Sequence, residues 1–244
     1  MNGFLSVFKR EFKSYFATPV AYVFLVIFLI AAPFLAFQNG AFFKMGQASM
    51  QSFFQFIPML FVFMVPSTAM RMWAEERNSG SIELLFTLPI TVGQAVLGKF
   101  IAAWAFLTIA LLLTFPFPLT VANLGNPDWG LIITGYIGSI LLAGSFLAIG
   151  SFFSALSKNQ VISFILTVVV LGILLRLGMP STLSILDTFL PNGFLVFVEA
   201  ISIQIHFESM LRGVIELKDI LFFVGLICGA LYANMLLLDE RKAA

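Results

Sequence analysis

Charged residues are scarce in this sequence, because Asp, Glu, Lys and Arg together make up only 10% of its 244 residues. A soluble domain carries about a quarter charged residues, so this chain could not cover a water-exposed surface, and a soluble globular enzyme is excluded. The net charge of +1 gives no indication of nucleic acid as a partner. Disorder is excluded as well, since 60% of the residues are apolar and 30 are Phe.

The residue types that build catalytic and metal centres are equally few. The single Cys permits no internal disulfide, and the single His, His206, has no second His and no Cys nearby with which to bind a metal. A Ser-His-Asp catalytic triad cannot be assembled around this single His either. The sequence therefore predicts no catalytic residue, no metal site and no cofactor in this chain.

One stretch, Gly93–Phe100, partly matches a phosphate-binding loop through Gly93, Gly98 and Lys99. Phe100 stands where Ser or Thr must hold magnesium, and the stretch leads into an apolar run instead of following a buried strand. We interpret the match as chance, and Lys99 as an anchor in the lipid headgroup layer.

Long uncharged apolar runs dominate what is present. A bilayer core takes about 20 apolar residues of helix, and the runs predict six spans, near residues 19–38, 56–73, 96–122, 131–156, 160–179 and 219–238. The runs lack the alternation of barrel strands. The expected fold is an all-α membrane protein with a single transmembrane domain over residues 1–244. No span has an Asp or Glu near its centre, which argues against an ion-driven carrier.

Lys and Arg set the expected orientation, because cytoplasmic loops carry the excess of positive charge. With six spans both termini share one side. That side carries Lys9, Arg10, Lys13, Arg71, Arg77, Lys99, Lys158, Arg241 and Lys242, and the other carries Lys44, Arg176, Arg212 and Lys218. Both termini are therefore expected in the cytoplasm, with residues 218–244 forming the last span and a cytoplasmic tail.

Residues 1–18 predict an amphipathic interface helix in the cytoplasmic headgroup layer. It would be either an anchor that only fixes the topology or an elbow helix that also contacts a cytoplasmic partner. Its apolar face carries Phe4, Phe8, Phe12 and Tyr15, and its cationic face carries Lys9, Arg10 and Lys13.

The first five spans are expected within residues 19–179. The sizeable cytoplasmic loop between them covers residues 74–95. Asn78-Ser79-Gly80 is a turn signal, Ser81 is expected to cap a short apolar helix over residues 81–88, and Pro89 ends it. An apolar helix below the membrane needs cover, which either lipid or a groove on a partner protein would supply.

The external segment, residues 180–217, includes an apolar stretch, Phe194–Ile205, which at about 12 residues is too short to cross the bilayer. We interpret it as a re-entrant or interfacial helix after a Pro-Asn-Gly turn, acting either as a plug at the outer end of a pathway or as a lid. Its candidate residues are Asn192, Gly193, Glu199, His206 and Glu208.

Small residues recur four apart along the fourth span, a spacing that lets helices approach closely. They indicate either packing within the chain or a seam between subunits. They are Gly135, Ser139 and Ala143, Gly144 and Ala148, and Gly150 and Ser154.

Four motifs resemble those of an ABC-2 type transporter permease, most of all the branch that contains the gliding-motility-associated permease. They are Arg71-Met-Trp-Ala-Glu-Glu-Arg77, Gly80-Ser-Ile-Glu83-Leu-Leu, Leu88-Pro89 and Leu97-Gly98-Lys99-Phe100. The resemblance implies six helices, an N-terminal interface helix, a coupling helix between the second and third spans, and external re-entrant helices before the sixth.

The resemblance also implies a separate ABC ATPase dimer, which would bind ATP and Mg and meet the coupling loop. The residues expected to contact it are Glu75, Glu76, Arg77, Gly80, Ser81, Ile82, Glu83, Leu85 and Phe86. The residues assigned to the interface helix are Phe8, Lys9, Arg10, Phe12 and Lys13. The other implied partners are membrane lipids and either a second permease copy or a related permease, a class that includes larger subunits with a periplasmic domain.

These observations favour the membrane subunit of an ATP-driven exporter, dimeric and placed in the bacterial inner membrane. Two alternatives stay open. The chain could be an ATP-independent channel or secondary carrier, or a non-transporting scaffold that links a cytoplasmic ATPase to a process in the cell envelope.

Overall fold

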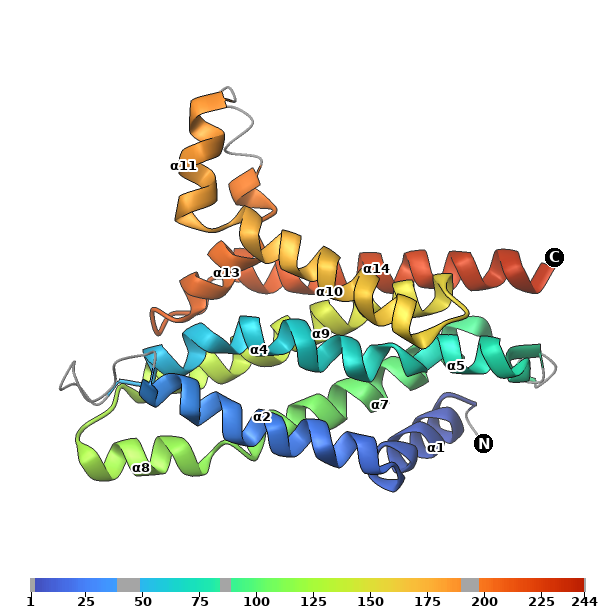
Figure 1. The fold of residues 1–244 in the computed structure, drawn as a ribbon, viewed down its shortest axis with the longest axis horizontal. Helices are drawn as coiled ribbons and strands as arrows, with labels where there is room; N and C mark the ends of the chain where they lie inside the picture. Colours follow the sequence, from blue (N-terminus) through green and yellow to red (C-terminus); the bar gives the residue numbers. More distant parts are fainter. Residues whose placement is uncertain (1–2, 39–48, 84–88, 190–197, 244) are drawn as a thin grey trace.

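The computed structural model describes residues 3–38, 49–83, 89–189 and 198–243, and every regular element in these ranges is a helix (Figure 1). The all-α fold class is therefore confirmed. The helices are α1 (Gly3–Ala17), α2 (Pro19–Gln38), α4 (Gln51–Ala69), α5 (Arg71–Ser79), α7 (Val92–Leu112), α8 (Pro116–Leu124), α9 (Trp129–Leu156), α10 (Gln160–Leu177), α11 (Pro180–Phe189), α13 (Ile203–Met210) and α14 (Leu217–Ala243).

Six helical stretches of the described ranges are long and apolar enough to cross a membrane. They are Ala21–Gln38, Gln51–Ser79, Val92–Leu124, Trp129–Leu156, Gln160–Leu177 and Leu217–Arg241. Each coincides with a predicted span. Figure 1 shows both termini at the same end of the bundle, beside α1 and α5, as an even number of spans requires. We call this the α5 end and the opposite one the α8 end.

Helix α9 lies in the middle of the bundle and packs against α4, α7, α10 and α14. All the small residues noted in the fourth span are buried within the chain. A Cβ at Gly135 would come within 2.6 Å of the Phe54 ring, and one at Gly144 within 2.9 Å of Trp104. Packing within the chain, the first of the two interpretations, therefore accounts for this spacing.

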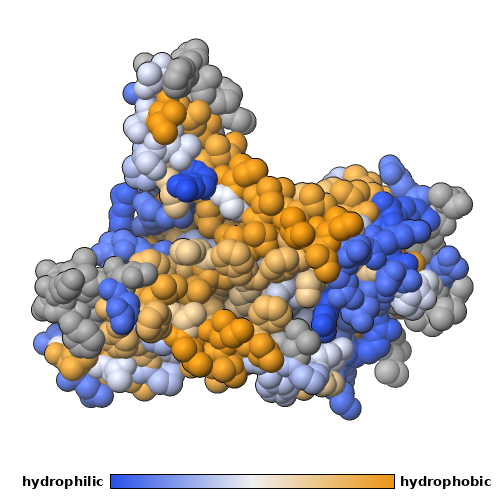
Figure 2. Space-filling view, viewed as in Figure 1, coloured by the Kyte–Doolittle hydropathy of each residue, from blue (hydrophilic) through white to orange (hydrophobic). Residues whose placement is uncertain are grey.

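Helices α2, α10 and α14 lie at the periphery and expose apolar side chains. Ile30 of α2, Ile173 of α10 and Leu221 of α14 are all more than half exposed. Figure 2 shows hydrophobic residues over the middle of the visible face and hydrophilic residues gathered at the α5 end. This distribution is the one that a bilayer around the middle of the bundle requires.

Proline interrupts the third span near its outer end. Helix α7 ends at Leu112, and α8 begins with Pro116 at its first helical position, where the missing N–H costs nothing. The second span continues beyond its predicted end, because α5 follows α4 after a single residue, Met70. The loop expected over residues 74–95 is thus helical up to Ser79.

Two local predictions are wrong. Ser81 does not cap the next helix, because helical backbone already starts at Ser81 and its hydroxyl lies 2.9 Å from the Ser79 hydroxyl. The stretch Phe194–Ile205 is not one helix where it is described, because the chain turns at Ile201 and the Ser202 hydroxyl accepts the Ile205 N–H at 3.3 Å to begin α13. A serine hydroxyl that bonds the backbone favours such a start over a continuous helix.

Helix α11 lies in the external segment, where the resemblance implies helices before the sixth span, although the residue pattern indicated only the stretch Phe194–Ile205. It stands away from the bundle at a steep angle to the long helices in Figure 1.

Candidate functional site

Helix α5 is held on α9 by one buried hydroxyl. Ser154 Oγ accepts the N–H groups of Trp73 and Ala74 at 3.0 and 3.1 Å and donates to the carbonyl of Met70 at 3.0 Å. Met70 is the junction between α4 and α5, so a single side chain of α9 bonds both this junction and α5. Buried backbone groups need such partners, which fixes where α5 lies.

More bonds extend this attachment along α5. The indole Nε1 of Trp73 donates to Ser151 Oγ at 3.2 Å, and the amide of Asn234 donates to the same hydroxyl at 2.7 Å. The Arg77 guanidinium donates to the carbonyl of Ala155 at 2.6 Å. Helix α5 is thereby connected to α9 and, through Ser151, to α14.

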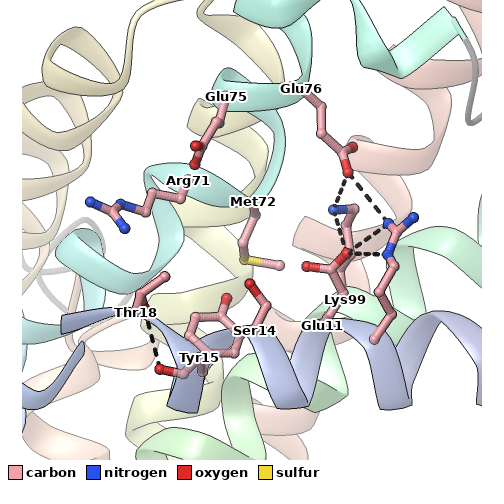
Figure 3. Close-up of a pocket in the computed structure, with 10 residues that line it drawn as sticks. Glu11, Ser14, Tyr15, Thr18, Arg71, Met72, Glu75, Glu76 and Lys99 are labelled. Carbon is pink, nitrogen blue, oxygen red and sulfur yellow. Dashed lines mark hydrogen bonds and ion pairs between the residues drawn. The ribbon is translucent and has the colours of Figure 1, made fainter. Parts of the chain in front are cut away.

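Four charged residues at the α5 end form what we call the Lys99 cluster: Arg10, Glu11, Glu76 and Lys99. Figure 3 labels Glu11, Glu76 and Lys99. The Lys99 ammonium lies 2.8 Å from Glu76 and 3.2 Å from Glu11, and the Arg10 guanidinium lies 2.7 Å from Glu11 and 3.5 Å from Glu76. The cluster joins α1, α5 and α7 through ion pairs between residues far apart in the sequence.

Lys99 is not the headgroup anchor that its position in the sequence suggests. Its side chain is only 3% exposed, and its ammonium also lies 5.2 Å from the centre of the Trp73 ring. A buried ammonium needs compensating carboxylates, and Glu11 and Glu76 supply them. Lys99 is therefore the centre of an internal ion-pair cluster.

Helix α1 packs closely on α7. A Cβ at Gly98 would lie 2.9 Å from Val7 Cγ1, so only glycine lets the two helices approach to this distance. The rings of Tyr15 and Phe106 stack with centroids 5.3 Å apart. Burial, together with the nearby Glu11 carboxylate, raises the pKa of the Tyr15 phenol. The interface helix is thus part of the protein core on one face.

A cavity of about 400 Å³ opens between α1, α5 and the start of α7. Figure 3 shows the Lys99 cluster on one side of it, and Arg71 and Glu75 on the other. Its lining consists of Arg10, Glu11, Ser14, Tyr15, Thr18, Arg71, Met72, Glu75, Glu76 and Lys99.

The residues expected to contact an ATPase fall into two groups. Glu75, Gly80 and Glu83 are exposed at the α5 end, with Ser81 and Ile82 partly buried between them. Glu76 and Arg77 are instead bonded within the chain. Leu85 and Phe86 lie outside the described residues. The sequence could not separate the two groups, because their partners on α7 and α9 are distant in the chain.

The interface helix has the expected two faces. Phe8 and Phe12 stack with ring centroids 5.6 Å apart on one side. Lys9, Arg10 and Lys13 are exposed on the other, although Arg10 also belongs to the Lys99 cluster.

At the α8 end, His206 of α13 contacts a residue of the last span that no motif in the sequence indicates. Its Nδ1 lies 2.7 Å from a carboxylate oxygen of the fully buried Asp219, and its Nε2 lies 3.1 Å from the carbonyl of Ala200. Its ring stacks on Phe222 at 4.0 Å. These contacts join α13 to the start of α14. We call them the His206 contact.

The other external candidates are not brought together with it. Glu199 and Glu208 are exposed, and Glu208 accepts a hydrogen bond from Gln204 at 2.7 Å. Asn192 and Gly193 lie outside the described residues.

The ionisation of Glu11 gives the Lys99 cluster a defined pH dependence. Burial acts to raise the pKa of this carboxyl, but Lys99 and Arg10 outweigh it and hold the pKa below the ordinary value of 4.5. The ionised form therefore stabilises the fold fully above pH 4.5, and this contribution is lost as the pH falls through the lowered pKa.

We expect Glu11→Gln to melt at a lower temperature than the wild type at pH 7, with the difference shrinking below pH 4.5. Melting curves in mild detergent at several pH values measure it. A difference that does not change with pH would contradict the ion-pair role of Glu11.

The fold and the site define a multi-span membrane protein whose α1, α5 and α7 are joined by buried charges at one end. The family model described as ABC-2 family transporter protein matches residues 5–232. The chain therefore belongs to the ABC-2 transporter family and is the membrane component of a transport system. A comparison with curated proteins gives no match.

Proposed function

We propose that this chain is the permease subunit of an ATP-driven exporter in the bacterial inner membrane, with both termini in the cytoplasm. Two copies, or this chain and a related permease, build the pathway, and a separate ABC ATPase docks at the α5 end. The observation that supports this most is the position of α5, whose Trp73 and Ala74 are buried while Glu75 and the chain from Asn78 to Gly80 are exposed.

The bonds of α5 supply a route for coupling. A nucleotide-driven movement of the ATPase shifts a permease only through contacts that differ between the two states. The exposed Glu83, in the helical turn that follows α5, offers such a contact, and the bonds of α5 to Ser154 and Lys99 carry a displacement to α9, α7 and α1. We assign Glu76 and Arg77 to positioning α5, because their side chains are bonded within the chain.

The assignment to a particular branch of the family rests on the sequence motifs of residues 71–100. The resemblance of residues 71–100 to the gliding-motility-associated branch supports a system in which a second, larger subunit carries a periplasmic domain. Ile82, Leu85 and Phe86 would supply the apolar part of the ATPase contact. Lipids, glycans, amphiphiles or peptides are the substrate classes that this assignment allows.

Reversing the exposed charge of Glu83 tests the docking site. We expect Glu83→Lys to retain about tenfold less ABC ATPase than the wild type after purification in mild detergent, which corresponds to a loss of about 1.4 kcal/mol. The matched control is Asp187→Lys, which reverses an exposed carboxylate on α11 and should retain the ATPase fully.

Two results would overturn the proposal. Equal ATPase recovery with Glu83→Lys and with the wild type would remove Glu83 from the contact. A wild-type chain that recovers no ATPase, yet moves a substrate without ATP in vesicles, would favour the channel or carrier.

A further inference from the structure

Two charged residues of the cavity at the α5 end have no partner within the described part of the chain. Neither Arg71 nor Glu75 makes an ion pair there, and the Nε atom of Arg71 is buried without a hydrogen-bond acceptor. Almost all buried donors in proteins have an acceptor. The charges of the Lys99 cluster on the opposite side of the cavity compensate one another, although Glu76 Oε2 is also buried there without a donor. Arg71 and Glu75 are the charged residues of the lining that belong to no ion pair in the described ranges.

The cavity lies at the level where the apolar spans end. Thr18 comes directly before α2, and Arg71 comes two residues after the end of the apolar α4. Both residues line the cavity. The polar headgroups of a bilayer lie at this level, next to the ends of the hydrocarbon-spanning helices.

A small second cavity continues from the first toward the middle of the bundle. It shares Tyr15, Thr18 and Arg71 with the first and is otherwise lined by Ala21, Phe24, Ser67, Thr68 and Phe106. Its volume of about 30 Å³ is too small for a whole acyl chain. It does place apolar surface of α2 and α7 directly beside Arg71, as a ligand with a charged head and an apolar tail requires.

We propose that this cavity binds the headgroup of a zwitterionic phospholipid with a primary amine, phosphatidylethanolamine. Its phosphate pairs with Arg71, because a guanidinium matches phosphate geometry with two parallel hydrogen bonds. Its ammonium pairs with Glu75. A phosphoglycerol headgroup leaves Glu75 unpaired, and the quaternary ammonium of phosphocholine has no N–H to donate. The site lies in one chain and requires no transport, so it goes beyond the proposed function.

Lipid binding by the purified protein tests this assignment. The chain, with any subunits that co-purify, is stripped of lipid in detergent and titrated with phosphatidylethanolamine, phosphatidylglycerol or phosphatidylcholine of the same acyl chains. Bound lipid is counted by native mass spectrometry and confirmed by the rise in melting temperature. The wild type should bind phosphatidylethanolamine about tenfold more tightly than the other two, the effect of one charge-assisted contact.

Two variants separate the contributions of the phosphate and of the ammonium. Arg71→Gln should weaken the binding of all three lipids about tenfold, whereas Glu75→Gln should remove only the preference for ethanolamine. Glu75 is exposed, so its replacement is compatible with folding. Lys9→Gln is the matched control, because Lys9 is an exposed cation of α1 outside the cavity, and it should leave binding unchanged.

Water-soluble phosphoethanolamine distinguishes the lipid from a free phosphate ester. It should bind far more weakly than the lipid, and equal affinity would overturn the assignment to a lipid. A preference for ethanolamine that persists in Glu75→Gln, or unchanged binding in Arg71→Gln, would overturn the site.

Discussion

Replacing Lys99 with methionine should lower the free energy of unfolding by about 3 kcal/mol, the low end of the range for removing one partner of a buried ion pair. Methionine keeps most of the side-chain volume, so the loss comes from the charge. Without the ammonium, Glu11 and Glu76 lie close together in a site where each is less than a fifth exposed. Arg10 compensates only in part, because its own side chain is 53% exposed.

Denaturant unfolding in mild detergent measures this loss, and two further variants decide its origin. Lys9→Met removes an exposed cation of α1 and should change stability little. Adding Glu76→Gln to Lys99→Met should recover part of the lost stability, since it removes one of the two uncompensated carboxylates. If the double variant were no more stable than Lys99→Met alone, repulsion between the carboxylates would not be the cause.

Replacing Gly150 with leucine should separate α9 from α4 and destabilise the protein by about 3 kcal/mol, the upper end for overpacking a core. Even a Cβ at this position would lie 2.6 Å from Ala69 Cβ, and a Cβ bonded directly to backbone cannot rotate away. Ser154 follows one helical turn later, so the same displacement stretches its bonds to Met70, Trp73 and Ala74. The attachment of α5 should therefore weaken together with the core.

Gly172 provides a matched control for this substitution. It lies in α10, and nothing is within 4 Å of a Cβ built there, so Gly172→Leu should change the melting temperature little. Both variants are measured by melting curves and by the amount of ABC ATPase that co-purifies. Equal melting temperatures for the two variants would contradict the close approach of α9 and α4.

The sequence predicts the spans well because each span is encoded by its own residues. An apolar run of about 20 residues is sufficient to predict a membrane helix, and a proline such as Pro116 marks a break without reference to any other part of the chain. The small residues of α9 likewise indicate close packing, although the sequence alone could not say which helices are in contact.

The candidate site was less predictable because it depends on distant pairs. Lys99 is a cation at the edge of an apolar run, and nothing local indicates that Glu11, 88 residues earlier, compensates its charge. The sequence indicates only a small packing residue at Ser154, because its bonding partner Trp73 is 81 residues away in the chain. From the sequence, Asp219 is expected only to be a polar residue at the start of the last span, whereas in the structure it is the buried partner of His206. The contacts expected at Leu85 and Phe86 stay predictions.

The His206 contact at the α8 end has a mechanical consequence for α13. The two nitrogens of one ring face a carboxylate oxygen of Asp219 and the carbonyl of Ala200. A single side chain of α13 therefore links the residues just before this helix to the start of the last span. Any displacement of the last span at Asp219 must accordingly pull α13 along with it.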